Sequence, residues 1–121
     1  MDSDRCTAPA LAPAKGAPTR FEVSRNAEFT LVRVAGEVDP ATADEFASTI
    51  RERFQPGGRV AVDLGGVTFM GACGVSACLE VQREGRAGGC DVAFAGAQGL
   101  VARVLQILDV EQTLSGWIGR P

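Results

Sequence analysis

RVAVDLGGVTFMGACGVSACLEVQREGRAGGCDVAFA, residues 59–95, contains two apolar runs separated by one helical segment. Residues 59–64 form a short apolar run bounded by glycines, which predicts a buried central strand. A glycine-rich connection over 65–72 leads to a predicted helix over 74–86, which a Gly-Gly pair ends. Residues 91–95 predict the next strand. Two strands joined by a single helix favour parallel neighbours in one sheet, and therefore an α/β fold.

The residues before this segment predict two further strands and a helix. The strands cover 21–24 and 29–35, and Gly36 is expected to end the second one. Asp39 is predicted to be the N-cap of the helix that follows, with Pro40 at its first position. The apolar residues at helical spacing on one face of this helix are Ala43, Phe46, Ala47, Ile50 and Phe54.

The residues after it predict a third helix over 98–108 and a final short strand or extended end over 113–118. The apolar face of the third helix, Leu100, Val101, Val104, Leu105 and Leu108, is expected to be core. The order β-β-α-β-α-β-α-(β) predicts a mixed sheet of four to five strands, with an antiparallel hairpin at one edge and helices packed on it. We expect a single domain over 20–121, preceded by a disordered Ala/Pro-rich tail over 1–19.

The composition restricts the classes of function. The chain has 121 residues, a net charge of -3 and no histidine, so it lacks the usual general base and the commonest metal ligand. Its cysteines, Cys6, Cys73, Cys78 and Cys90, form no C-x-x-C pair. We therefore expect no enzyme, no metal and no cofactor. Without a basic block, a secretory signal or a long apolar run, we expect a cytoplasmic protein that neither binds nucleic acid nor inserts into a membrane.

Two junctions between a strand and the next helix are candidate sites, because functional residues of open α/β sheets gather at the carboxyl ends of strands. The first is Gly36-Glu37-Val38-Asp39, and the second is VTFMGACGV at 67–75. Cys78 lies on the apolar stripe of the second helix and Cys90 opens a strand, so both are predicted to be small core residues. Cys6 is expected to be exposed in the tail.

These junctions resemble the STAS domain of bacterial anti-sigma factor antagonists. The resemblance rests on G-E-V-D at 36–39, V-D-L at 62–64, F-M-x-x-x-G at 69–74, the Gly-Gly break at 88–89 and V-x-x-V-L at 101–105. It covers about residues 20–118. It implies a STAS-like fold and a regulatory binding module that docks onto an anti-sigma factor of the serine-kinase type and thereby frees a sigma factor, as in bacterial stress responses.

The sequence departs from this family at the regulated residue. The family segment reads M-D-S-S-G-[LV], and the partner kinase phosphorylates the serine before the glycine, which breaks the complex. Here Cys73 stands at that position, and Gly71 and Ala72 replace the preceding aspartate and serine. Because a thiol is not a substrate for ordinary serine kinases, the resemblance predicts a module that serine phosphorylation does not switch. Ser76, the nearest hydroxyl, lies too far into the helix to be a good substitute.

The resemblance and the junctions together give one set of candidate partner-binding residues: Glu37, Asp39, Gly71, Ala72, Cys73, Gly74 and Ser76. For Asp39, helix capping is an alternative that suffices by itself. For Cys73, one alternative is an oxidation sensor, because a helix amino end stabilises a thiolate. The other, which we favour, is a neutral replacement for serine without a signalling role.

Two alternatives to the phosphorylation-independent module remain open at this point. One is a redox-gated version of the same module, acting through Cys73. The other is a STAS-type subunit of a transporter or a larger signalling assembly, which would need a separate membrane partner. In each case we expect a monomer or a weak dimer.

Overall fold

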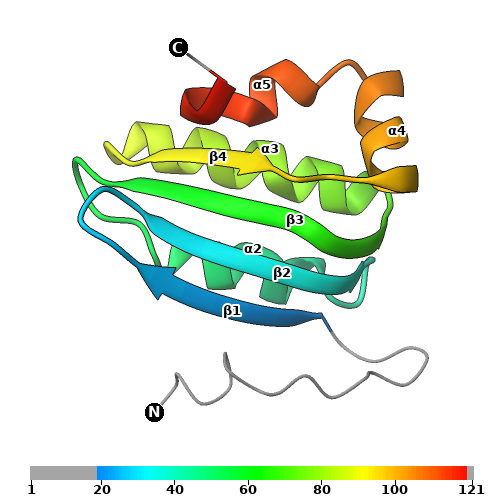
Figure 1. Cartoon of the computed structure of the whole chain (residues 1–121), viewed down its shortest axis with the longest axis horizontal. Helices are drawn as coiled ribbons and strands as arrows, with labels where there is room; N and C mark the ends of the chain where they lie inside the picture. The colour runs from blue at the N-terminus through cyan, green and yellow to red at the C-terminus, as the bar shows by residue number, and fades with distance from the viewer. Residues whose placement is uncertain (1–18, 120–121) are drawn as a thin grey trace.

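The structure, a computed structural model, describes residues 19–119. Its sheet has four strands in the order β1-β2-β3-β4 (Figure 1). The strands are β1 (Arg20–Arg25), β2 (Thr30–Val38), β3 (Arg59–Met70) and β4 (Asp91–Ala95). Strand β1 is antiparallel to β2, whereas β2, β3 and β4 are parallel. The predicted mixed sheet with an antiparallel hairpin at one edge is therefore confirmed. Residues 1–18 of the predicted tail and Cys6 lie outside the described residues.

The helices cover one face of the sheet and its β4 edge (Figure 1). Helices α2 (Ala43–Arg51) and α3 (Ala72–Ala87) pack behind the sheet and against each other. The chain ends with α4 (Gly99–Ile107), α5 (Glu111–Ser115) and the 3-10 helix η1 (Gly116–Gly119), which contact β3 or β4. Within residues 19–119, no helix has the length and apolar character needed to cross a membrane.

The core lies between the sheet and helices α2 and α3, because apolar residues alternate along the strands and share one face of each helix. The predicted face of α2 is confirmed: Phe46, Ala47 and Ile50 are buried, and Ala43 and Phe54 pack partly buried against the same cluster. The buried strand residues in that cluster are Val32, Val34, Val38, Val60, Val62, Leu64, Val67, Met70, Val92 and Phe94.

The predicted end of β2 at Gly36 and the predicted loop over 65–72 are both wrong. Strand β2 continues to Val38, and β3 continues to Met70, because the two strands keep pairing beyond their glycines. A Cβ at Gly66 would lie 3.0 Å from the Cβ of Ala35, so this glycine permits a close approach of the strands. Gly36 has a φ of 105° and lies where the register shifts. The glycines thus mark an irregular strand pair and not a break.

The predicted strand or extended end over 113–118 is also wrong, because these residues belong to α5 and η1. Leu114 is buried in the core, which holds α5 against the sheet. The Gln82 side chain of α3 donates to the carbonyl oxygens of Thr113 and Leu114 at 2.9 and 3.3 Å. Gly116, with a φ of 48°, then turns the chain from α5 into η1.

The third predicted helix is confirmed as α4, but its apolar face is only partly core. Val101 and Leu105 are buried, whereas Leu100 is 72% exposed and Leu108 is half-exposed. Helix α4 follows the short strand β4 at the edge of the sheet and contacts β3. A helix of nine residues in this position buries a narrow stripe, so the outer residues of a wide apolar face stay in solvent.

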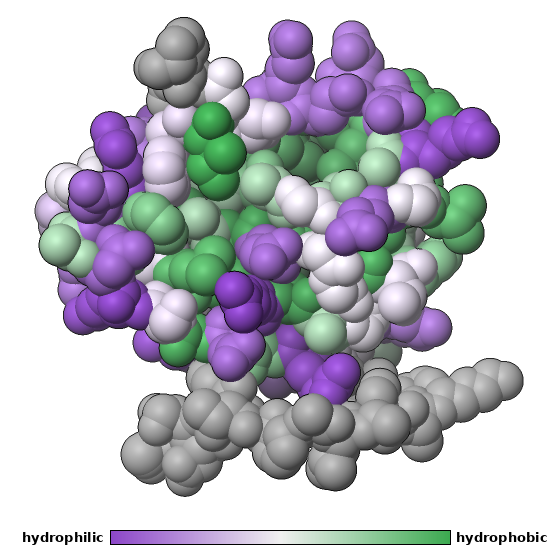
Figure 2. Space-filling view, in the orientation of Figure 1, coloured by the Kyte–Doolittle hydropathy of each residue, from purple (hydrophilic) through white to green (hydrophobic). Residues whose placement is uncertain are grey.

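The opposite face of the sheet is not covered by α2 and α3. Figure 2 shows this face, with hydrophobic residues at its centre and hydrophilic residues around them. An open hollow of about 710 Å³ on it is lined by residues that include Leu31, Ala61 and Trp117. The indole N–H of Trp117 donates to the Val60 carbonyl oxygen at 3.3 Å, which fixes η1 over the start of β3.

Candidate functional site

The carboxyl ends of β2 and β3 bring the two predicted junctions together. In the β2–β3 register Glu37 is paired with Phe69 and Val38 with Met70. The Gly71 N–H then donates to the Val38 carbonyl oxygen at 3.4 Å, next to the start of α3. The junctions thus lie side by side, and their exposed and half-buried residues are here called the strand-end surface: Glu37, Asp39, Phe69, Gly71, Ala72, Cys73 and Ser76.

The Glu37–Asp39 segment is held by side-chain hydrogen bonds from two threonines. The hydroxyls of Thr19 and Thr42 donate to the Glu37 carbonyl oxygen at 2.7 and 3.0 Å. Thr42 Oγ1 also accepts from the Asp39 N–H at 3.0 Å, while Asp39 Oδ1 accepts from the Thr42 N–H at 3.1 Å. This reciprocal pair is a capping box. It fixes the backbone of the segment and leaves the Glu37 side chain exposed.

Asp39 does cap the chain as predicted, but it caps a turn and not the first turn of the regular helix. Its carboxylate accepts from the N–H groups of Ala41 and Thr42, and its carbonyl oxygen accepts from Ala43. The prediction that Pro40 is the first helical residue is wrong, since α2 begins at Ala43. Residues 40–42 form a turn before α2, because the reciprocal hydrogen bonds between Asp39 and Thr42 close the chain into a loop there.

Helix α3 begins without a side-chain cap. Gly71 is its N-cap, no side chain accepts a hydrogen bond there, and its first turn carries no acidic residue. The Gly71 carbonyl oxygen accepts from the N–H groups of Gly74 and Val75 at 3.0 and 3.1 Å. The free N–H groups of the first turn make this end of the helix a region of positive potential. Cys73 lies half-buried in that turn, and Ser76 lies exposed one turn further on.

Gly74 sets how closely α3 approaches the strand ends. It is buried, and a Cβ there would lie 2.6 Å from Met70 Cγ and 3.0 Å from Val38 Cγ1. Both neighbours are themselves buried and have little room to move. A glycine at this position therefore lets the first turn of α3, with Cys73, lie against the ends of β2 and β3.

Replacing Gly74 by alanine is expected to lower the free energy of unfolding by about 2 kcal/mol, because overpacking forces buried neighbours to shift. Urea denaturation measures this directly. Gly88→Ala at the other end of α3 is the matched control, since its Cβ would meet nothing closer than 3.7 Å. Equal stability of Gly74→Ala and Gly88→Ala would show that α3 is free to move away from the strands.

The buried cysteines take no part in the strand-end surface. Cys78 and Cys90 are both buried in the core, as predicted. Burial raises the pKa of the Cys78 thiol, which keeps it protonated and unreactive. Among the cysteines of residues 19–119, Cys73 is thus the one at the surface.

The sequence interpretation did not name Phe69 as a binding residue, and it did not name Thr42 and Thr19 as residues that support the site. Phe69 is 47% exposed, and a Cβ at Gly71 would lie 3.5 Å from its ring. Strand alternation with the buried Met70 would have placed Phe69 outside, had β3 been extended that far. Thr42 belongs to a D-x-x-T capping-box pattern that was readable in the sequence. The role of Thr19 depends on a contact across 18 residues, which no local pattern indicates.

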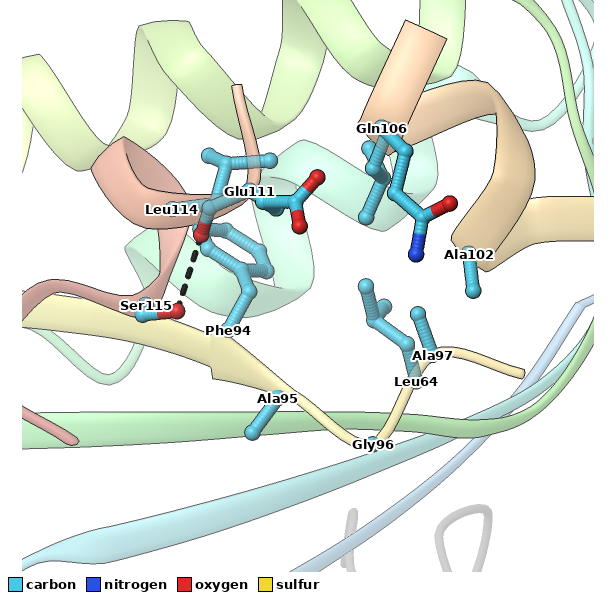
Figure 3. Close-up of a pocket in the computed structure, with 11 residues that line it drawn as sticks. Leu64, Phe94, Ala95, Gly96, Ala97, Ala102, Gln106, Glu111, Leu114 and Ser115 are labelled. Atoms are coloured by element: carbon cyan, nitrogen blue, oxygen red, sulfur yellow. Dashed lines mark hydrogen bonds between the residues drawn. The ribbon is translucent and has the colours of Figure 1, made fainter. Parts of the chain in front are cut away.

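A second cavity, of about 220 Å³, lies between α4, α5 and the end of β4 (Figure 3). The side chains of Gln106 and Glu111 point into it from α4 and α5, above an apolar floor that includes Leu64. The Ser115 hydroxyl donates to the Glu111 carbonyl oxygen at 2.8 Å. This cavity shares no residue with the strand-end surface. In the described part of the chain, no three acidic, cysteine or histidine side chains converge as metal ligands would.

The comparison with protein families identifies the class of this fold. The model of the family described as "Mlab, STAS domain" matches residues 21–116. The chain belongs to the STAS domain family. No curated protein matches the sequence.

Solved structures show the same fold in two kinds of protein. The anti-sigma factor antagonist SpoIIAA, in its unphosphorylated form, is 22% identical, with a TM-score of 0.62 over 76% of this chain and 83% of that one. An anti-sigma factor antagonist from Mycobacterium paratuberculosis is 20% identical, with a TM-score of 0.68 over 84% and 86%. The murine anion transporter Slc26a9 is 13% identical, with a TM-score of 0.55 over 84% of this chain but 19% of that one. At these identities the likeness concerns the fold.

Proposed function

We propose that this STAS domain is an anti-sigma factor antagonist-like binding module without catalytic activity. It docks its strand-end surface onto an anti-sigma factor of the serine-kinase type and so releases a sigma factor. The observation that carries the proposal is the pairing of Glu37 with Phe69, which joins both predicted junctions in one exposed surface. The fold that the chain shares with two anti-sigma factor antagonists supports the proposal.

The chemistry of the strand-end surface fits a protein partner. An exposed aromatic residue, Phe69, is paired with the exposed Glu37 across β2 and β3 and is followed closely by the start of α3. Large aromatic side chains are the usual centres of binding energy, and charged groups around them set orientation and partner choice. The segment is also held rigid by the Thr19 and Thr42 hydrogen bonds, so little ordering is needed on binding.

Serine phosphorylation does not switch this module. Cys73 stands where the resemblance expects the phosphoacceptor serine, and its thiol lies half-buried in the first turn of α3. Ser76 lies exposed on the next turn and is not at the helix start. With no hydroxyl at the position next to the free N–H groups, the partner's kinase activity has no ordinary substrate there. Binding is therefore independent of ATP.

Affinity capture from a lysate of the source organism, with and without ATP, tests this function. We expect an anti-sigma factor with a kinase domain to be captured equally well in both conditions, with residues 71–76 unmodified by mass spectrometry. Release of the partner by ATP together with modification of residues 71–76 would contradict the proposal. A bait carrying Glu37→Lys should capture less of the partner, whereas Glu80→Lys on the exposed side of α3 should not.

A second candidate function is a subunit of a transporter assembly. It is favoured by the fold that the chain shares with part of the anion transporter Slc26a9. Capture of a membrane ATPase in place of a soluble kinase, in the same experiment, would decide for this second function.

A further inference from the structure

The end of the sheet opposite the strand-end surface contains a polar pocket of about 180 Å³. It lies where the β1–β2 turn meets the connection from α2 to β3, which are neighbours at the left of Figure 1. The parallel strands β2 and β3 start here. At a rise of ~3.3 Å per residue, β2 spans about 26 Å from this pocket to the strand-end surface. The pocket is therefore a separate feature, independent of the proposed function.

Three arginines line this pocket. Arg25 ends β1, Arg53 follows α2, and Arg59 begins β3. None of the three forms an ion pair with a residue of the described range 19–119. One carboxylate, that of Glu28, lies at the rim and is exposed. Positive charge thus dominates the pocket, and the fold itself does not neutralise it.

Arg53 is the residue that distinguishes this pocket from an ordinary solvated basic patch. Its Nε is buried and has no hydrogen-bond acceptor among residues 19–119. A buried guanidinium N–H without an acceptor costs free energy, so the fold leaves the Arg53 guanidinium without the full set of partners that usually holds a partly buried arginine. Among the residues that line the pocket three are arginines and one, Glu28, is acidic, so an anion is the group that fits.

Two other side chains of the pocket, those of Arg59 and Asn26, are held in fixed orientations. The guanidinium of Arg59 lies over the indole of Trp117, with Cζ 5.1 Å from the ring centroid, which holds that side chain in place. Asn26 Oδ1 accepts from the N–H groups of Glu28 and Phe29 at 2.7 and 2.9 Å. This fixes the orientation of the Asn26 amide, whose NH₂ group forms no hydrogen bond within the described part of the chain.

We propose that Arg25, Arg53 and Arg59 form a binding site for a phosphate group. Guanidinium groups bind phosphate through paired, charge-assisted hydrogen bonds, and three of them match its charge and its several oxygens. The volume is about six times the ~30 Å³ that one water molecule occupies in the liquid. It admits a phosphate or the phosphate end of a monoester, whereas a whole nucleotide would extend into solvent.

An NMR titration of the whole chain with inorganic phosphate, at constant ionic strength and with chloride as the reference anion, tests the site. We expect phosphate to shift the amide signals of residues 25–30 and 53–59 more than chloride does. Arg53→Gln should weaken phosphate binding at least tenfold, because it removes one of the three guanidinium groups that line the pocket. Arg103→Gln, an exposed arginine on α4 with the same charge change, should leave it unchanged.

Equal effects of phosphate and chloride, or equal losses in Arg53→Gln and Arg103→Gln, would overturn the proposal, because binding would then reflect net charge alone. If Arg53→Gln does not fold, the double variant Arg25→Gln, Arg59→Gln decides, since both side chains are exposed. Glycerol 3-phosphate and vesicles that contain phosphatidic acid distinguish the source of the group. Binding of either supports the site and assigns a soluble ester or a lipid headgroup, and binding of none of the three phosphates overturns it.

Discussion

Replacing Gln82 by leucine is expected to lower the free energy of unfolding by about 3 kcal/mol, because it removes the side-chain donor of the buried Val92 and Leu114 carbonyl groups. Gln82 is 4% exposed, and its Nε2 donates to the carbonyl oxygens of Val92, Thr113 and Leu114 at 3.0, 2.9 and 3.3 Å. One amide thus connects α3 with β4 and α5. Leucine has a similar volume, so the loss in the free energy of unfolding measures the missing hydrogen bonds and not a cavity. Urea denaturation measures it.

The control for this substitution is Gln112→Leu on α5, which changes an exposed glutamine in the same way. We expect its effect on stability to stay within about 0.5 kcal/mol, as is usual for surface sites. Hydrogen exchange should also show faster exchange of residues 111–119 in Gln82→Leu. A loss below about 1 kcal/mol would mean that water replaces the amide without cost, and that α5 is held by Leu114 alone.

Replacing Phe69 by alanine is expected to weaken binding of the captured anti-sigma factor roughly thirtyfold, or about 2 kcal/mol, which is typical of an aromatic residue at the centre of an interface. The ring is 47% exposed, so the stability of the free domain should change much less. Isothermal titration calorimetry with the purified partner measures the affinity, and urea denaturation checks the fold.

Ile107→Ala is the control for Phe69→Ala. Ile107 is 73% exposed on α4, outside the strand-end surface, and its truncation also removes exposed apolar area. Its affinity for the partner should equal that of the wild type. If both variants bind as tightly as the wild type, Phe69 does not contact the partner and the proposed docking surface is wrong.

The sequence predicted the sheet and the core well, because both depend on local periodicity. Alternating Val32 and Val34 and the helical spacing of Phe46 and Ile50 each point to one buried face, which the structure confirms. Glycines misled the prediction, because a glycine can equally end a strand or permit a close approach of two strands. Only the partner strand decides, and in the case of Gly66 that partner is Ala35 in β2.

The candidate site was predictable as far as it depends on which strands pair. The position of Glu37 beside the start of α3 follows from the parallel pairing of β2 and β3, which the order of strands and helices already predicted. Phe69 lay within the predicted junction at 67–75 but was not named as a binding residue, because β3 was expected to end at residue 64 and strand alternation was not carried that far. The C-terminal residues were misassigned for a different reason: α5 is a short helix that depends on tertiary contacts with Gln82 and on burial of Leu114.

The position of Gln82 also bears on how this protein behaves at high concentration. An outer strand of a sheet offers unpaired backbone groups, to which a strand of another molecule can add, and such addition is a common start of aggregation. Strand β4 is an outer strand, but the Val92 carbonyl is bound by Gln82, and α5 and η1 lie along it. This edge of the sheet is therefore closed to intermolecular strand addition in the folded protein.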